Sequence, residues 1–254
     1  MLKKFNIKTP LIITLSVLTL LALIGFVGKR QADKTYEKLN VRINYDDGNT
    51  FVDDADIIRL VTLNGAEHIV GQKYNEVNLK EIEARVKKNA FIEQAQVYKD
   101  HKGNLIVEVE QCRPIARLIR TNDSHAYLGH QGSVIAVSEK FTPRVLVVDG
   151  PYVRLLMNEQ FLNGDTGKAY LNLIQFIDND KFWKAQIAQL TIDAYGDITM
   201  LAQVGNQVIR FGTPDDMEKK FIRLSVFYRK IVPVKGWNAY KTVNVKYKDQ
   251  IICE

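Results

Sequence analysis

The residues that could perform catalysis or bind a metal are few and poorly spaced for either task. Of the four histidines, only His125 and His130 are near each other. Their spacing, within a turn-rich stretch, does not match the Cys and His separations of common zinc sites. Gly132-Ser133 lacks the strand–turn–helix setting of a serine nucleophile, and no glycine-rich segment has the pattern of a phosphate-binding loop. The sequence therefore gives no support to catalysis and predicts neither a metal nor a cofactor.

Three carboxylates lie close together at Asp53, Asp54 and Asp56. They could hold a cation. Capping of a helix explains them more simply, because an aspartate at a helix N-terminus accepts hydrogen bonds from the first backbone N–H groups.

The two cysteines, Cys112 and Cys253, are too few for a disulfide framework. Each lies on the apolar phase of a predicted strand. They are therefore either buried thiols or, in an oxidising compartment, the two halves of one bridge.

The composition is that of a globular protein of one large or two ordinary domains, with 254 residues, 46% hydrophobic and 25% charged. The formal net charge is +6. Lys3, Lys4 and Lys8 lie in the first 28 positions, which contain no acid, so 32 basic and 29 acidic residues remain, a net of +3. This balance is too mild for a nucleic-acid-binding surface, and we expect no nucleic acid among the partners.

Basic residues gather near the C-terminus. They form either a solvated helix face and strand edge or a surface that attracts an acidic segment of a partner. The residues concerned are Arg223, Arg229, Lys230, Lys235, Lys241, Lys246 and Lys248.

Residues 11–28, LIITLSVLTLLALIGFVG, contain no charge. As a helix they would span about 27 Å at about 1.5 Å per residue, close to the hydrocarbon thickness of a bilayer. A cleaved signal peptide needs small residues at alternate positions after its apolar core, whereas this core runs into Lys29-Arg30. We therefore expect a single transmembrane helix over 11–28, a cytoplasmic tail over 1–10, and the bulk of the chain outside the cytoplasmic membrane.

The remaining chain predicts an α+β protein of two units. Residues 38–116 indicate the order β-α-α-β-β, in which Asp53 and Asn78 cap the two helices. Residues 117–254 indicate a β-rich unit of short strands with a helix over 164–180 and a late amphipathic helix over 213–232.

The ends of the late helix are marked by particular residues. Thr213 is the expected N-cap, Pro214 takes the first helical position, and Pro233 ends the helix.

The chain closes on TVNVKYKDQIICE, residues 242–254, which alternate as one half-buried β-strand. Its inward face is expected to contain Val243, Val245, Tyr247, Ile251 and Cys253. Its outward face is expected to contain Asn244, Lys246, Lys248 and Gln250.

An uncharged N-terminal segment, a β-α-α-β-β unit and a β-rich unit with a late helix and final strand together resemble the FtsQ/DivIB family of bacterial division proteins. QCRPIA (111–116) is similar to the run that leaves the family's POTRA domain. AYLGHQGSVI (126–135) resembles a family strand, with Gly129 in place of the usual acid. VLVVDG (145–150) lies where the family has a proline-containing stretch, without that proline.

The closing strand shows the most telling similarity. VNVKYKDQIIC resembles the family's final strand, with Asn244 in place of an acid and Lys246 in place of an arginine. Tyr247 is retained.

The resemblance implies a non-enzymatic scaffold made of a POTRA domain and a β domain. Family members lie in the inner membrane at the division septum and bind the FtsB–FtsL coiled-coil pair, with other division proteins, outside the cytoplasm. The partner adds a strand to the edge formed by the last β-strand, where backbone groups are unpaired. Carried onto this sequence, the partner-binding residues are Lys246 and Tyr247, supported by Val243, Val245 and Ile251.

Two other classes of protein compete with this interpretation. A POTRA-containing component of outer-membrane assembly or secretion would normally have serial POTRA units or a barrel, and neither is visible. An anchored enzyme acting on the cell wall would need paired carboxylates, a serine site or a zinc site, and the sequence contains no such constellation.

Overall fold

The computed structural model describes residues 15–22, 34–45, 48, 50–120 and 124–254. The chain forms two units. Unit 1 comprises Met1–Asn44 and Val52–Glu110, and unit 2 comprises Tyr45–Phe51 and Gln111–Glu254.

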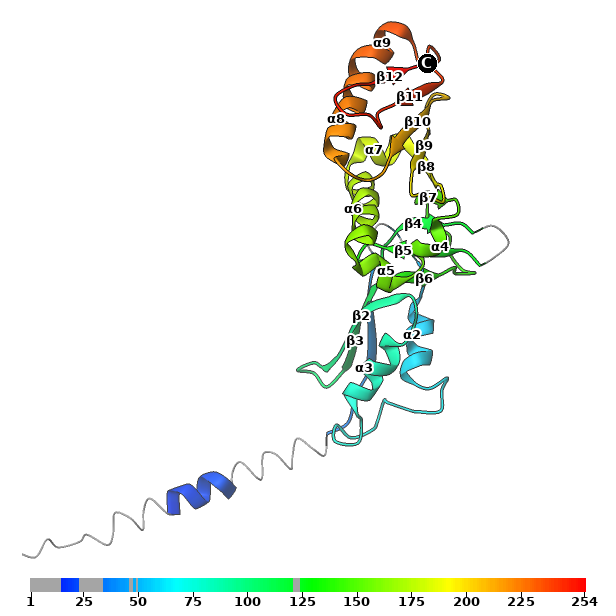
Figure 1. Cartoon of the computed structure of the whole chain (residues 1–254). Coiled ribbons are helices and arrows are strands. Elements are labelled where there is room, and N and C mark those ends of the chain that lie inside the picture. Colours follow the sequence, from blue (N-terminus) through cyan, green and yellow to red (C-terminus); the bar gives the residue numbers. More distant parts are fainter. Residues whose placement is uncertain (1–14, 23–33, 46–47, 49, 121–123) are drawn as a thin grey trace, which may run out of the picture. The chain divides into compact units, whose positions relative to one another are not determined.

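Residues 15–22 are helical, with exposed side chains (Figure 1). The rest of the predicted membrane span over 11–28, and the predicted cytoplasmic tail over 1–10, lie outside the described residues. Within the described residues, no helix combines the length and the apolar character that a membrane crossing requires.

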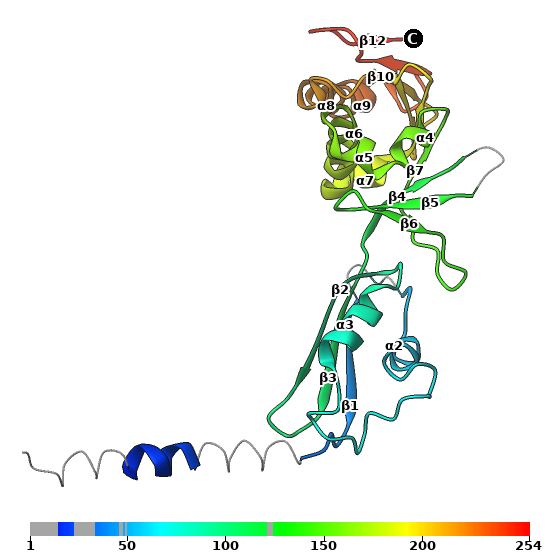
Figure 2. The same cartoon turned by 60° about the horizontal axis from the view of Figure 1, so that its bottom comes forward.

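Unit 1 has the predicted order β-α-α-β-β (Figure 2). The sheet order is β1-β3-β2, so β3 is central, and β1 runs parallel to it. β1 and β2 are therefore edge strands. The elements are β1 (Leu39–Asn44), α2 (Asp54–Val61), α3 (Leu79–Lys87), β2 (Ile92–Lys99) and β3 (Leu105–Gln111).

The core of unit 1 lies between the sheet and its two helices. α2 buries Ile57 and Val61, and α3 buries Ile82 and Val86. These side chains pack with the alternate strand residues that include Val107. The apolar residues that recur at helical spacing in α2 and α3 and at every second position in the strands thus form one apolar layer.

Asp53 caps α2, as predicted. Its side chain accepts the Asp56 N–H at 2.8 Å, and the Asp56 carboxylate accepts the Asp53 N–H at 3.0 Å. This reciprocal capping accounts for these two carboxylates of the acidic cluster without a cation. Within the described residues, no group of three or more His, Cys, Asp or Glu side chains could hold a metal ion.

Unit 2 contains a nine-stranded mixed sheet in the order β12-β11-β10-β9-β8-β7-β4-β5-β6. Its strands are β4 (Pro114–Leu118), β5 (Ala126–Gly129), β6 (Val134–Ala136), β7 (Leu146–Asp149), β8 (Ile187–Ile192), β9 (Ile198–Ala202), β10 (Val208–Gly212), β11 (Thr242–Asn244) and β12 (Ile252–Cys253). Its helical elements are α4 (Val153–Leu156), α5 (Glu159–Asn163), α6 (Asp165–Asn179), α7 (Lys181–Gln186), α8 (Met217–Val226), the π-helix η2 (Phe227–Ile231) and α9 (Val232–Lys235).

Helices α6, α7 and α8 lie together on one side of the strands β7 to β10 (Figure 1). α6 contributes Leu173 and Ile177 to the core, and α8 contributes Phe221 and Leu224. These side chains belong to one buried cluster with strand residues such as Ile209. The helical layer therefore holds β10 in position next to the C-terminal strands.

The ends of the late helix differ from the prediction over 213–232. α8 begins at Met217 after Asp216, which has a left-handed φ of 50°, and the Thr213 hydroxyl donates to the Asp215 carboxylate at 2.8 Å instead of capping the helix. Pro233 does not end the helix. After the π-helix, a new short helix begins at Val232, so Pro233 lies in its first turn, where the missing N–H is not needed.

Both cysteines are thiols in the described structure, and Cys112 alone is buried as the first of the two alternatives expects. Cys112 is buried and Cys253 is half-buried. Burial raises the pKa of the Cys253 thiol above its ordinary value.

Gly167, in the first turn of α6, lies where α5 and α6 meet. A Cβ atom added there would collide with the carbonyl oxygen of Phe161 and lie 2.7 Å from the Leu162 Cα. At the neighbouring Gly164, the same atom would lie 3.3 Å from the Phe161 carbonyl oxygen. The close approach of backbone to backbone therefore requires glycine at 167.

We predict that Gly167→Ala destabilises unit 2 by more than about 2 kcal/mol, the range of overpacking effects. Helix propensity alone predicts the opposite sign, a gain of about 1 kcal/mol. Chemical unfolding of the full chain measures the difference, with Gly164→Ala as the matched control and an expected change below about 1 kcal/mol. Equal stability of the two variants would contradict the packing described here.

Candidate functional site

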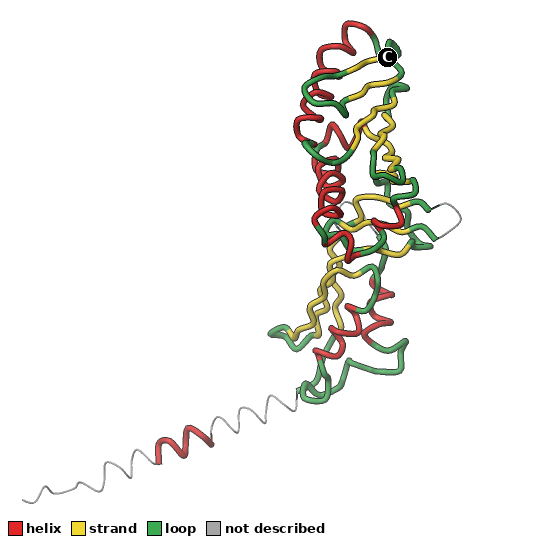
Figure 3. The backbone as a smooth tube through the Cα atoms, viewed as in Figure 1, coloured by secondary structure: helices red, strands yellow, loops and turns green. Residues whose placement is uncertain are grey.

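The C-terminal residues form a hairpin instead of the predicted single long strand (Figure 3). After the three residues of β11 the chain turns near Asp249, whose φ is 57°, and returns as β12. Val243 lies opposite Cys253. Directly opposed residues share a face of the sheet, so the period-two apolar pattern is the same for a hairpin as for one strand.

The return of the chain covers the outer edge of β11. The Thr242 N–H donates to the Glu254 carbonyl at 2.9 Å, and the Glu254 N–H donates to the Thr242 carbonyl at 2.9 Å. On its other side, β11 pairs in parallel with β10. The backbone of β11 is thus paired on both sides, and β12 becomes the end strand of the sheet.

The open backbone position at this end is Cys253. Successive residues of a strand direct their N–H and C=O groups to opposite edges. Because Glu254 exchanges hydrogen bonds with β11, the groups of Cys253 point away from the sheet. The sheet can accept a further strand here.

Lys246 is held against the sheet at both ends of its side chain. Its Nζ pairs with the Asp197 carboxylate, from the turn between β8 and β9. Its stem covers Gly212, where an added Cβ would lie 2.8 Å from the Lys246 Cγ. The hydrogen bond to Asp197 raises the pKa of the Lys246 ammonium above its ordinary value. The Lys246 N–H donates to the Asn244 side chain at 3.0 Å, so this backbone group is also occupied.

The other predicted partner-binding residues differ in how far their side chains are exposed to solvent. Val243 and Val245 are fully buried in the core of unit 2, and Ile251 packs against the same core. Tyr247, expected on the inward face, is 51% exposed. Among these residues, Tyr247 therefore offers the largest side-chain surface to a partner, and the valines contribute by fixing the strand.

Sequence reasoning did not single out Asp197 or the open position at Cys253. Asp197 is 49 positions from Lys246, so no local pattern joins them. The hairpin did leave a signal, because Lys248, Asp249 and Gln250 form a polar run, and aspartate tolerates the left-handed turn conformation.

The basic stretch forms an exposed surface beside the hairpin. Between Lys219 and Lys248 the chain has nine Lys and Arg residues and no acid. Four of them are internally occupied: Lys219 pairs with Asp216, Lys246 pairs with Asp197, buried Lys220 donates to the Thr213 carbonyl at 2.7 Å, and Arg223 donates to the Val245 carbonyl at 3.0 Å. Within the described residues, five exposed ones have no ion pair: Arg229, Lys230, Lys235, Lys241 and Lys248.

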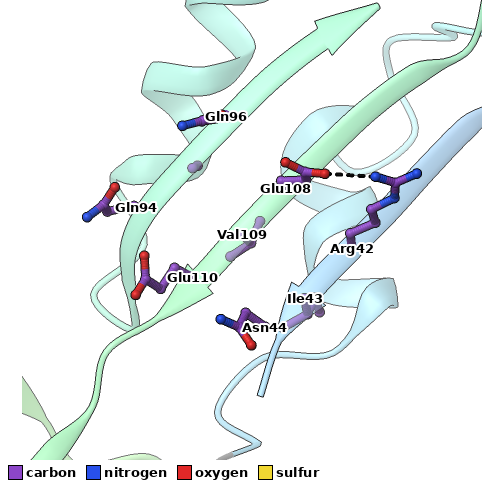
Figure 4. Close-up of a pocket in the computed structure, with 9 residues that line it drawn as sticks. Arg42, Ile43, Asn44, Gln94, Gln96, Glu108, Val109 and Glu110 are labelled. Carbon is purple, nitrogen blue, oxygen red and sulfur yellow. Dashed lines mark hydrogen bonds and ion pairs between the residues drawn. The ribbon is translucent and has the colours of Figure 1, made fainter. Parts of the chain in front are cut away.

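A shallow groove of about 420 Å³ lies on the outer face of the unit 1 sheet (Figure 4). Arg42 and Glu108 form an ion pair across it at 2.9 Å, and the Tyr98 hydroxyl donates to the same carboxylate at 2.8 Å. Tyr98 and Arg42 hold the pKa of Glu108 below its ordinary value. Arg42, Tyr98 and Glu108 therefore satisfy one another, which suits a solvated sheet face.

Unit 2 thus has a strand end open to pairing, with a basic surface beside it. Comparison with protein families gives the particular class. Residues 35–110 match the POTRA-like domain, and residues 113–254 match the family described as FtsQ/DivIB, C-terminal related. The second match spans more than half of the chain, and the chain belongs to the FtsQ/DivIB family, whose role is scaffolding in cell division. No curated protein matches the sequence.

Backbone amide exchange tests the geometry of the hairpin. We predict that the Thr242 amide, bonded to Glu254, exchanges much more slowly than the Cys253 amide, which points away from the sheet. Deleting residues 252–254 should abolish the protection of Thr242 while leaving that of Val245, bonded to Arg210, unchanged. If the Cys253 and Thr242 amides were equally protected in the monomeric chain, the Cys253 N–H could not point away from the sheet as described.

Proposed function

We propose that this protein is a single-pass membrane scaffold of the bacterial division machinery, which recruits an FtsB/FtsL-like pair through strand addition at its C-terminal end. Membership of the FtsQ/DivIB family supports the scaffolding role. The observation that carries the binding mode is the end strand β12, because the outward backbone groups of Cys253 are available for main-chain pairing.

The hairpin refines which groups take part. The partner strand pairs with β12 and not with β11, whose backbone is already paired on both sides. Tyr247 covers an apolar side chain of the partner while its hydroxyl stays in water. Val243, Val245 and Ile251 keep the hairpin in position, and Lys246 acts through its pair with Asp197.

The basic surface gives the partner its charge preference. Five exposed cations beside the hairpin attract a segment rich in Asp and Glu and bring it toward the sheet. They are Arg229, Lys230, Lys235, Lys241 and Lys248. Exposed pairs of this kind contribute chiefly to the association rate, while main-chain pairing sets the lifetime of the complex.

The apolar N-terminal segment places the protein. Residues 11–28 serve as the membrane anchor, with residues 1–10 in the cytoplasm and both units outside the cytoplasmic membrane. With this anchor and its family's role in division, the protein lies in the inner membrane at the division septum. A role in outer-membrane assembly is disfavoured, because residues 113–254 match the division family and not a further POTRA unit.

We predict that Tyr247→Glu lowers co-purification of the FtsB/FtsL-like pair at least about tenfold, since it places a charge in an apolar contact. Tyr247 lies outside the strands and is half exposed, so the unfolding midpoint should not change. The control is Val137→Glu, at an exposed position following β6, the opposite edge strand. Recovery that is equal for Tyr247→Glu and the unaltered chain would refute the proposed site.

A second prediction concerns the anchor. Deleting residues 1–28 should move the chain from the membrane fraction to the soluble fraction, because no other apolar segment of this length occurs in the sequence. Deleting residues 1–10 alone should leave it in the membrane fraction. If the 29–254 chain still sedimented with membranes in cells that lack the partner pair, the assignment of the anchor would fail.

A further inference from the structure

A second charged site lies in unit 2, built on the buried carboxylate of Asp178 in α6. The Arg113 Nη2 lies 2.6 Å from one oxygen of this carboxylate, and the Lys184 Nζ lies 2.7 Å from the other. The Asp178 side chain is 5% exposed. A carboxylate buried to this degree needs such partners, and this one holds α6, α7 and the start of β4 together.

Two adjoining cavities open beside this ion-pair group, with volumes of about 500 Å³ and about 150 Å³. They share Arg144, Val145 and Lys184. The larger cavity is of the size that holds small ligands or single side chains. We call the two together the Arg144 pocket. The other residues that line the larger cavity are Pro114, Phe141, Thr142 and Pro143.

Packing supports the apolar part of the wall of the Arg144 pocket. The Phe141 ring packs edge-on against Phe51, with ring centroids 5.4 Å apart. Pro143 is buried and fixes the backbone directly before Arg144. These contacts hold the apolar side chains in place before a ligand binds, which lowers the ordering cost of binding.

The charge of the Arg144 pocket is unbalanced. Among the residues that line the two cavities, Arg144 and Lys184 are cations and Asp178 is the one carboxylate, which leaves a formal charge of +1. Within the described residues, the exposed Arg144 makes no hydrogen bond or ion pair. Its guanidinium has a planar fork of N–H donors that fits a carboxylate with two parallel bonds. Lys184 uses one of its three N–H donors on Asp178.

We propose that the Arg144 pocket binds a carboxylate borne on an apolar peptide segment, with Arg144 and Lys184 holding the carboxylate and Phe141 and the prolines contacting the apolar part. This site is separate from the C-terminal hairpin and does not rest on the function proposed for that edge. Its occupant is a protein segment, because Phe141, Val145 and the prolines line the larger cavity next to the cations, whereas a site for bare anions would be polar throughout.

The test uses the full chain in detergent micelles, with methyl-labelled Ile and Val followed by NMR. N-acetylphenylalanine, which has a carboxylate on an apolar body, is expected to shift the signals of the lining residues Ile115, Val145 and Ile187. N-acetylphenylalanine amide has the same body without the charge and should not shift them.

Arg144→Gln should weaken binding of N-acetylphenylalanine at least about tenfold, as expected for loss of a charge-assisted hydrogen bond. Arg144→Lys keeps the positive charge but lacks the planar guanidinium. Its affinity for N-acetylphenylalanine should therefore lie between those of the unaltered chain and Arg144→Gln. The control, Lys181→Gln, removes an exposed charge of α7 that does not line either cavity. Unfolding midpoints of all variants should agree, because Arg144 contributes no ion pair to the fold.

Three outcomes would overturn the proposal. The amide could shift the same signals as strongly as the acid, or Arg144→Gln could bind the acid as tightly as the unaltered chain. Inorganic phosphate could also bind at least as tightly as N-acetylphenylalanine, which would make the pocket a general anion site.

Discussion

The unpaired backbone at the ends of the nine-stranded sheet is the constraint on which the proposed partner binding by unit 2 depends. An open sheet always ends in strands whose outward N–H and C=O groups lack partners within the sheet. Here those strands are β6 and β12, and both are short, which limits indiscriminate pairing. At β12, the exchange of hydrogen bonds between Thr242 and Glu254 moves the open position from β11 to Cys253. The strand addition that we propose would therefore take place at Cys253.

The surrounding structure supports that end of the sheet in two ways. The helical segment from α8 to α9 returns the chain so that β11 pairs in parallel with β10, and Phe221 and Leu224 fix it on the core. The same segment contains many of the unpaired cations. The exposed cations and the strand end at β12 therefore belong to one continuous piece of sequence. A partner with acidic residues beside a strand could contact both of them.

The sequence was a good guide where the signals are local. Asp53 was predicted as a cap from its position before an apolar helical repeat, and the order of unit 1 followed from periodicity and turns. The prediction that Pro233 ends the late helix was wrong, because the π-helix before Val232 lets a new helix begin with Pro233 in its first turn. Local signals also failed at the closing strand, since opposed residues of a hairpin preserve the two-residue alternation.

The side-chain pairs at the two candidate sites could not be predicted, because tertiary structure alone brings them together. Lys246 meets Asp197 across 49 positions, and Arg113 meets Asp178 across 65. Tyr247 was predicted as a partner-binding residue from the family resemblance, and its exposure is consistent with that role. Whether it binds a partner stays a prediction of the proposed function.

The most direct measurement is a structure of the full chain bound to the partner pair with which it co-purifies. Strand addition predicts a partner main chain beside β12, with its N–H and C=O groups about 2.9 Å from those of Cys253. It also predicts that Tyr247 is covered by an apolar partner side chain. A partner that docks elsewhere, with the Cys253 backbone still exposed to water, would contradict the account.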